Sequence, residues 1–215
     1  MNTAQTRTYS RIALFAALIA AGSYISIPIP GSPVPVVLAN LFVVLAGMVL
    51  GPWNGMLSAG VYLLIGTAGL PVFSAGSGGP AHLVGPTGGY LVGYLVAAMV
   101  TGLTIKALRP DGDRKYRAIS SGILAALAGL ATVYIPGALW LANVLELSPT
   151  AAIATGVVPY IPGDILKAAA AGLVLPALIR SGLISGGRRT RSPEDADRAT
   201  APERPRSEDD PENTR

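Results

Sequence analysis

Two ionisable side chains three residues apart, Asp164 and Lys167, are the residues of this sequence best placed to do chemistry. They stand near the start of a long apolar segment, where a helix would carry both on one face. An ionisable group in such a setting is costly and usually marks a functional cavity. The carboxylate accepts hydrogen bonds and the ammonium donates them, so the pair suits a polar ligand. The alternative is an ion pair that only neutralises two charges. Pro159, Pro162 and Gly163 favour a helix start here, and its free backbone amides would suit an anionic ligand.

Other arrangements that support catalysis are missing from the sequence. There is no cysteine, which excludes disulfides, thiolate nucleophiles and sulfur-ligated metals. His82 is the single histidine, so a histidine metal site within one chain and a Ser–His–Asp set are both excluded. No phosphate loop of the ATPase type occurs. The sequence therefore predicts a binding protein that is not an enzyme, needs no cofactor or metal and has no energy source of its own.

The charge distribution identifies the body of the chain as membrane-embedded. Lys and Arg number 16 and Asp and Glu 12, yet none of them lies in the 94 residues from Ile12 to Ile105. A soluble domain carries about a quarter of its residues charged, so a soluble globular fold is excluded. The net charge of +4 does not indicate nucleic-acid binding, because the basic residues of the body cluster between apolar spans.

Six apolar stretches can be compared with the roughly 20 helical residues that cross a ~30 Å hydrocarbon core. They predict an all-α membrane protein with six transmembrane helices, near Ile12–Ile27, Val34–Leu50, Trp53–Leu70, Gly88–Leu108, Tyr116–Trp140 and Ile161–Leu183. Lys and Arg occur before the first span, between the fourth and fifth, and after the sixth, which predicts cytoplasmic termini. Residues 1–184 form this membrane domain, and residues 185–215, rich in charge and proline, are expected to be a disordered cytoplasmic tail.

A segment rich in glycine and proline, Gly69–Tyr90, connects the third and fourth spans and has no charged residue. Its backbone groups would lack hydrogen-bond partners in lipid, so we expect it at the outer surface or folded over a cavity. A flexible connector would be polar. Phe73 and Leu83 instead favour an ordered external loop that packs as a lid or a cavity wall.

The first span carries small residues four apart in two adjacent rows. Ala13, Ala17 and Ala21 form one row, and Ala16 and Ala20 form the other. Such rows let another helix approach closely in lipid. The spacing fits both a contact with a partner protein and packing within this chain.

Four blocks of the sequence resemble the BioY family of biotin transporters. They are PVPVVLANLFVVLAGMVLGP from Pro33, YLLIGTAGLPVFSAGSGG from Tyr62, GPTGGYLVGY from Gly85 and VVPYIPGDILKAAAA from Val157. The resemblance covers nearly all of the membrane body and leaves the tail out. It implies the substrate-binding S component of an energy-coupling factor (ECF) transporter. Such a component is a six-helix protein of the prokaryotic cytoplasmic membrane that binds biotin with high affinity for uptake.

The resemblance also implies partners in the membrane. S components work with a transmembrane T component and two ATPase subunits, which would supply the missing energy. The alanine rows of the first span resemble the A-x-x-x-A contact to the T component. Whether this chain works alone, as a homo-oligomer or only with that module is left open by the sequence.

Biotin has groups that suit the polar residues of this chain. Its ureido N–H groups need an acceptor such as Asp164, and its carbonyl or carboxylate needs a donor such as Lys167. Neutral hydrogen bonds and apolar walls would complete the site; the candidates are Asn40, Thr87, Tyr90, Tyr160 and Asn143 for the bonds, and Trp140 and Phe73 for the walls. The family commonly has Gln where this chain has Ala39, so one contact is weakened unless Asn40 replaces it.

Two other functions are consistent with the same residues. The first is an S component for another small vitamin, such as thiamin, riboflavin or a biotin precursor, although an aromatic content of 6% favours biotin over a flat-ring ligand. The second is a membrane assembly protein whose alanine rows are its working surface. Such a protein would tolerate the replacement of Asp164 and Lys167 together.

Overall fold

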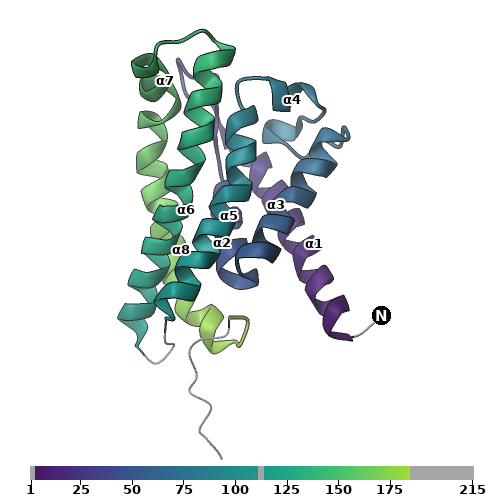
Figure 1. The fold of residues 1–215 in the computed structure, drawn as a ribbon, viewed down its shortest axis with the longest axis vertical. Coiled ribbons are helices and arrows are strands. Elements are labelled where there is room, and N and C mark those ends of the chain that lie inside the picture. Colours follow the sequence, from purple (N-terminus) through teal and green to yellow (C-terminus); the bar gives the residue numbers. More distant parts are fainter. Residues whose placement is uncertain (1–2, 111–113, 185–215) are drawn as a thin grey trace, which may run out of the picture.

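The structure, a computed structural model, describes residues 3–110 and 114–184, which form a bundle of helices (Figure 1). The predicted disordered tail, residues 185–215, lies outside these ranges. The elements are α1 (Thr3–Tyr24), β1 (Ser26–Ile27), β2 (Val36–Val37), α2 (Ala39–Leu50), α3 (Pro52–Thr67), η1 (Ser74–Gly76), α4 (Ala81–Val84), α5 (Gly88–Leu108), α6 (Lys115–Val144), α7 (Pro149–Gly156), η2 (Val158–Tyr160) and α8 (Ile161–Arg180).

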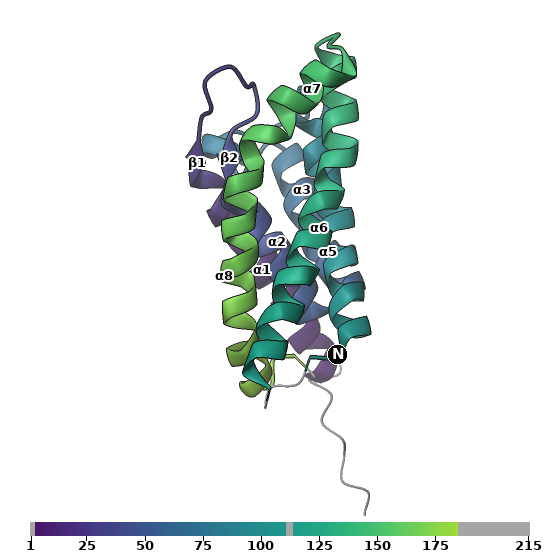
Figure 2. The same cartoon turned by 90° about the vertical axis from the view of Figure 1, so that its left-hand side faces the viewer.

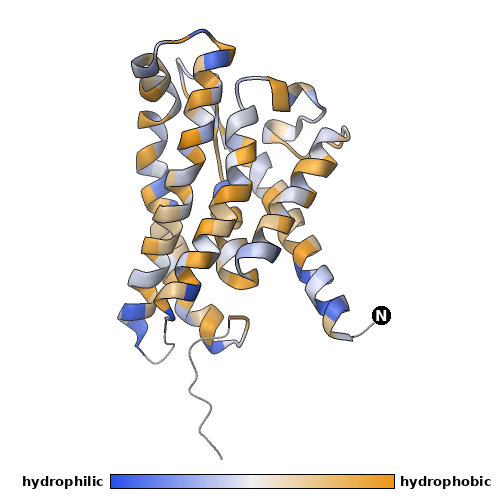
Figure 3. Cartoon of the chain, in the orientation of Figure 1, coloured by the Kyte–Doolittle hydropathy of each residue, from blue (hydrophilic) through white to orange (hydrophobic). Residues whose placement is uncertain are grey.

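Helix α5 lies between the two sides of the bundle. It packs against α6 on one side and against α2 and α3 on the other, while α8 packs on α6 and α1 on α2 and α3. Helix α1 begins and α8 ends at the same end of the bundle (Figures 1 and 2). Hydrophilic residues gather at that end, whereas apolar residues dominate the helices between the ends (Figure 3).

Glycines let the helices approach one another closely. A Cβ atom built on Gly122 of α6 would lie 2.8 Å from the Cα atom of Gly172 in α8. A Cβ atom on Gly47 of α2 would lie 2.2 Å from the backbone oxygen of Ala98 in α5. Side chains would push these helix pairs apart, so the small residues fix the bundle geometry.

The expected spans agree with the helices to different degrees. Helix α5 has both predicted ends, and α6 and α8 differ from their predictions by a few residues. Helix α1 begins nine residues earlier than Ile12, and α2 is only 12 residues long because Val36 and Val37 pair as a strand with Ser26 and Ile27. Within the described residues, three helical segments are long and apolar enough to cross a membrane: 88–108, 115–144 and 149–180.

The Gly/Pro-rich segment between α3 and α5 folds over one end of the bundle and contains η1 and α4. Its backbone is tied to α3 by the amide of Gly79, which donates to the oxygen of Gly66 at 2.8 Å. The indole Nε1 of Trp140 in α6 donates to the oxygen of Gly85 at 3.0 Å. The Phe73 ring packs on Gly66, where a Cβ atom would meet the ring at 2.3 Å. These contacts hold the segment against two helices, α3 and α6.

Candidate functional site

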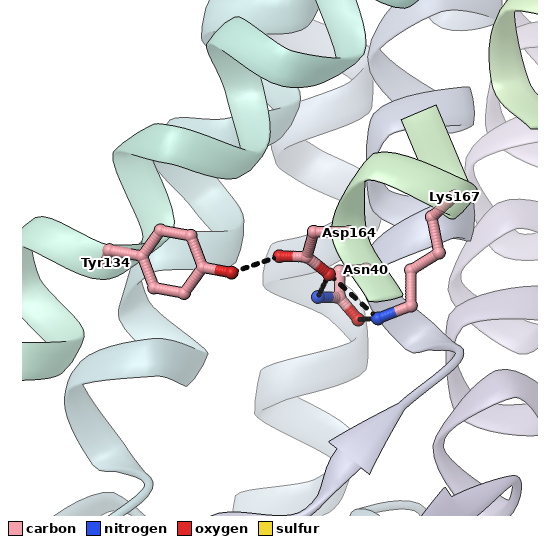
Figure 4. Close-up of polar contacts among 4 residues, drawn as sticks. All are labelled: Asn40, Tyr134, Asp164 and Lys167. Atoms are coloured by element: carbon pink, nitrogen blue, oxygen red, sulfur yellow. Dashed lines mark hydrogen bonds and ion pairs between the residues drawn. The ribbon is translucent and has the colours of Figure 1, made fainter. Parts of the chain in front are cut away.

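A polar cluster joins three helices that are far apart in the sequence (Figure 4). Asp164 and Lys167 lie one turn apart at the start of α8, and their side chains form an ion pair of 2.9 Å. Asn40 of α2 donates from Nδ2 to Asp164 Oδ1 at 3.2 Å and accepts from Lys167 Nζ at 3.3 Å. Tyr134 of α6 donates its hydroxyl to Asp164 Oδ2 at 2.5 Å. Both charged residues are buried, with 6% and 8% of their surface exposed.

Local sequence places each member of the cluster. Pro162 stands in the first turn of α8, where its missing amide costs nothing, so the helix starts just before Asp164. Asn40 is the second residue of α2, which begins one residue after the extended strand β2 ends. Tyr134 lies two residues before Pro136, inside the long helix α6. The charged pair therefore faces two neutral polar groups across the bundle.

The cluster forms one side of a cavity of about 60 Å³ with mainly apolar and aromatic walls. Two covering segments contribute to these walls. The Gly/Pro-rich segment supplies Phe73, Ser74, His82 and Thr87, and the β1–β2 connection supplies residues 34–37. The helices supply Ser23, Asn40, Tyr62, Tyr90, Leu91, Tyr94, Val133, Tyr134, Asp164 and Lys167, and η2 supplies Tyr160. A cavity of this volume holds several water-sized groups, since one water needs about 10–15 Å³.

The cover formed by the β1–β2 connection is bonded to the end of η2. The Tyr160 hydroxyl donates to the backbone oxygen of Val34, and it shares a hydrogen bond of 2.6 Å with the Ser32 hydroxyl. Figure 2 shows the strand pair beside the upper part of α8. Two segments therefore contribute to the cavity walls, and each is held by a side-chain hydrogen bond from the bundle.

The hydrogen-bond inventory of the cluster shows what it can offer a ligand. Asp164 accepts three hydrogen bonds from described residues, and an ionised carboxylate has about four acceptor sites. Lys167 donates two bonds to described residues and has three N–H groups in total. One acceptor site, on Oδ2 of Asp164, and one N–H donor of Lys167 thus remain, on a pair whose formal charges cancel. This pattern suits a neutral group that carries an N–H and a carbonyl on adjacent atoms.

Seven of the nine predicted ligand residues line this cavity: Asn40, Phe73, Thr87, Tyr90, Tyr160, Asp164 and Lys167. The structure places the other two, Asn143 and Trp140, outside the lining of this cavity. At about 100° per residue, Trp140 and Asn143 point about 120° and 180° away from the direction of Tyr134. The Asn143 side chain donates from Nδ2 to the oxygen of Leu139 in its own helix. The Trp140 indole bonds to Gly85 of the Gly/Pro-rich segment.

Several residues of the cavity were not predicted from the sequence, and Tyr134 is the most important of them. A tyrosine inside an apolar helix was an available signal, because a buried phenol normally has a hydrogen-bond partner. Tyr62 gave the same signal, and its hydroxyl pairs with that of Ser23 at 2.8 Å. Ala39, which stands where the family commonly has Gln, is fully buried, while its neighbour Asn40 supplies an amide to the cluster.

The structure separates the two alanine rows of α1. Ala16 lies in the core, and Ala20 packs against the same core, so this row serves the contacts of α1 with its own bundle. Ala13, Ala17 and Ala21 are exposed on the outer face of the helix. The exposed row of Ala13, Ala17 and Ala21 is therefore the one that a partner helix can reach.

Known proteins are similar to this chain in sequence and in fold. The sequence profile of the BioY family matches residues 1–182. A probable biotin transporter BioY of Pyrococcus horikoshii is 40% identical over 174 residues, which cover 81% of this chain and 97% of that protein. The biotin transporter BioY of Rhodobacter capsulatus is 42% identical over 177 residues, which cover 78% and 90%.

A solved structure agrees with these sequence matches. The crystal structure of the S component for biotin from an ECF-type ABC transporter superposes with a TM-score of 0.73 and 30% sequence identity. The superposition covers 84% of this chain and 95% of that protein. Together, the profile match over most of the chain, the two relatives and the shared fold show that this chain belongs to the BioY family.

Proposed function

We propose that this chain is the biotin-binding S component of an ECF transporter and that its ligand cavity captures biotin for uptake. The observation that carries the proposal is the buried cluster of Asp164, Lys167, Asn40 and Tyr134, which keeps one acceptor and one donor unused. The names of its relatives, biotin transporters, agree with this ligand. As a binding and translocation subunit, the chain performs no reaction on biotin.

The charge balance of the cluster favours one orientation of biotin. A carboxylate beside the neutral Asp164–Lys167 pair would leave a net negative charge buried, which is costly. The neutral ureido ring avoids that cost: one N–H donates to Asp164 and the carbonyl accepts from Lys167. The thiophane ring and the valeryl chain then lie among the aromatic walls, and the carboxylate faces the covering segment that supplies Ser74, His82 and Thr87.

The same proposal includes six membrane crossings, by α1, α2, α3, α5, α6 and α8, within a membrane domain of residues 1–184. Helices α2 and α3 are about 18 and 24 Å long at about 1.5 Å per residue, which is short for a ~30 Å core. The extended residues 34–37 before α2 line the cavity, and non-helical backbone is tolerated at membrane depth when protein encloses it. The hydrophilic end with both described termini then faces the cytoplasm of a prokaryotic cell, and the Gly/Pro-rich segment lies outside.

Energy for uptake would come from partner subunits, a T component and two ATPases. The exposed row of Ala13, Ala17 and Ala21 is the surface we propose for the T component, because small side chains let a partner helix approach closely. The inner row of Ala16 and Ala20 is already used within the chain. The alternative is that the chain transports biotin alone or as a homo-oligomer. Biotin uptake by the reconstituted protein, with and without the partner subunits, distinguishes the two.

The first test is isothermal titration of biotin into the detergent-purified protein. We expect tight one-to-one binding that Asp164→Asn and Lys167→Ala each weaken by tenfold or more. The matched controls are Glu146→Gln and Lys115→Met, which change exposed residues outside the cavity lining and should bind as the wild type does. Absence of binding to the folded protein at micromolar biotin would refute biotin as the ligand and lead to trials of thiamin and riboflavin.

The orientation is tested with two biotin analogues. In 2-iminobiotin the carbonyl is replaced by an imine, which becomes a cation when protonated, so it should bind much more weakly than biotin. Biotin methyl ester keeps the ureido ring and loses only the carboxylate charge, so we expect the smaller loss of affinity for the ester. The reverse order would place the carboxylate at Lys167.

A further inference from the structure

A second cavity, of about 570 Å³, lies between the ends of several helices. It is an open cavity lined by the junction of α2 and α3, the last turn of α5 with Arg109 and Pro110, Arg11 of α1 and residues 183–184. This is the end of the bundle at which α1 begins and α8 ends, away from the ligand cluster at the start of α8 (Figure 1). The biotin site makes no use of this cavity.

Positive charge surrounds the second cavity. Arg11 of α1, Lys106 of α5 and Arg109 after α5 contribute to its lining, and all three are exposed. No acidic residue belongs to the lining among the residues that the structure describes. The N-terminus of α3 opens at the same place, since Gly51 and Pro52 line the cavity and no side chain caps this helix. Three cations and the positive end of a 16-residue helix thus converge on one space.

The remaining walls of the cavity are apolar. They come from Met48, Val49 and Leu50 at the end of α2, Ile105 in α5, and Leu183 and Ile184 after α8. A small soluble anion would have no use for such walls. A molecule with a phosphate next to hydrocarbon chains would satisfy both the cations and the walls.

We propose that this cavity binds the phosphate headgroup of an anionic membrane phospholipid. Arg11, Lys106 and Arg109 would contact the phosphate, and the acyl chains would leave along the apolar helix surfaces. In the proposed topology the cavity opens at the cytoplasmic leaflet, where anionic lipids attract basic side chains near the membrane surface. A basic pocket between helices on that side is a known arrangement for lipid headgroups.

The experiment compares lipid retention by three purified full-length proteins in detergent. They are the wild type, the cavity variant Arg11→Gln/Lys106→Gln/Arg109→Gln, and the control variant Lys115→Gln/Arg117→Gln/Arg180→Gln. The control removes the same number of charges from exposed positions outside the cavity lining. Native mass spectrometry during titration with phosphatidylglycerol, or with phosphatidylcholine, gives a dissociation constant for the first bound lipid. Thermal unfolding of each protein without added lipid shows that the variants are folded.

We expect the wild type and the control to bind phosphatidylglycerol in preference to phosphatidylcholine. The cavity variant should bind it about a hundredfold more weakly, since each basic residue near an anionic headgroup contributes roughly fivefold. Equal affinity of the three folded proteins for phosphatidylglycerol would overturn the proposal. Displacement of the lipid by millimolar glycerol phosphate, which has the same phosphate and no acyl chains, would overturn the lipid as the occupant and identify a soluble phosphate ester instead.

Discussion

Replacing Asp164 and Lys167 together separates ligand binding from folding. Asp164→Asn alone leaves the Lys167 ammonium buried, with 8% of the residue exposed and without its counter-ion. Breaking a buried ion pair in this way destabilises a protein by about 3–5 kcal/mol, and Lys167→Met alone should do the same to the carboxylate. The double variant Asp164→Asn/Lys167→Met leaves no buried charge. Its free energy of unfolding should therefore lie within about 1 kcal/mol of the wild type, since neutral replacements of buried pairs are often tolerated.

Biotin affinity should follow the opposite pattern. The double variant loses two hydrogen bonds between the ligand and charged groups, each contributing about 1.5–3 kcal/mol. A total of about 3–6 kcal/mol corresponds to a dissociation constant roughly 10² to 10⁴ times higher. The double variant should thus be as stable as the wild type and bind biotin much more weakly than the wild type does.

Two measurements on the same preparations check this prediction. Unfolding in detergent, followed by tryptophan fluorescence, ranks the stability of the wild type, the two single variants and the double variant. Isothermal titration then gives their biotin affinities. Glu146→Gln/Lys115→Met, which removes one exposed charge of each sign, is the control and should match the wild type in both assays. A double variant as unstable as the single variants would show that the pair has a structural role. Wild-type biotin affinity in the double variant would show that the cluster does not bind biotin.

Three further predictions concern packing. Gly66→Ala would place a Cβ atom 2.3 Å from the Phe73 ring, so we expect weaker biotin binding and a stability loss of about 1–3 kcal/mol. In the control Gly60→Ala the nearest atom to the new Cβ is 3.7 Å away, so titration and unfolding should show no change. The hydroxyl of Thr101 is buried and has no hydrogen-bond partner among the described residues, so Thr101→Val should raise the unfolding temperature, and a lower one would disprove the reasoning. Ala17→Leu, on the exposed row, should leave biotin binding intact and prevent co-purification with the T component and ATPases. Ala16→Leu, in the core, should destabilise the isolated chain, and a loss of stability in both variants would refute the division of the rows.

Patterns with a local physical cause could be predicted from the sequence. The fourth expected span, Gly88–Leu108, coincides with α5 because a glycine and proline segment precedes it and charged residues follow it. The second expected span begins too early, at Val34. Proline at position 35 disfavours helical geometry in the residue before it, and Val36 and Val37 extend to pair with β1.

The side-chain cluster depended on helix packing that no local pattern contains. The three-residue spacing puts Asp164 and Lys167 on one face, but it does not reveal that Asn40 and Tyr134 meet them from α2 and α6. For α6 the apolar residues surround the helix, so the sequence gives no inward direction. The sequence therefore predicts Trp140 as a cavity wall and does not indicate Tyr134, although the two residues lie less than two turns apart on α6.

The charge balance of the proposed site explains how a buried ion pair can serve recognition. Asp164 and Lys167 neutralise each other and are hydrogen-bonded to Asn40 and Tyr134, so the protein itself fixes the position of each group. A ligand needs to satisfy only the remaining acceptor and donor. A molecule that lacks either the N–H or the carbonyl would leave the acceptor of Asp164 or the donor of Lys167 buried without a hydrogen-bond partner. Sites of this kind discriminate against such analogues by roughly 10⁴-fold or more. In the site that we propose, selectivity for the ureido ring would follow from the two unused hydrogen-bonding positions, while the aromatic walls would contribute affinity to any apolar molecule of similar size.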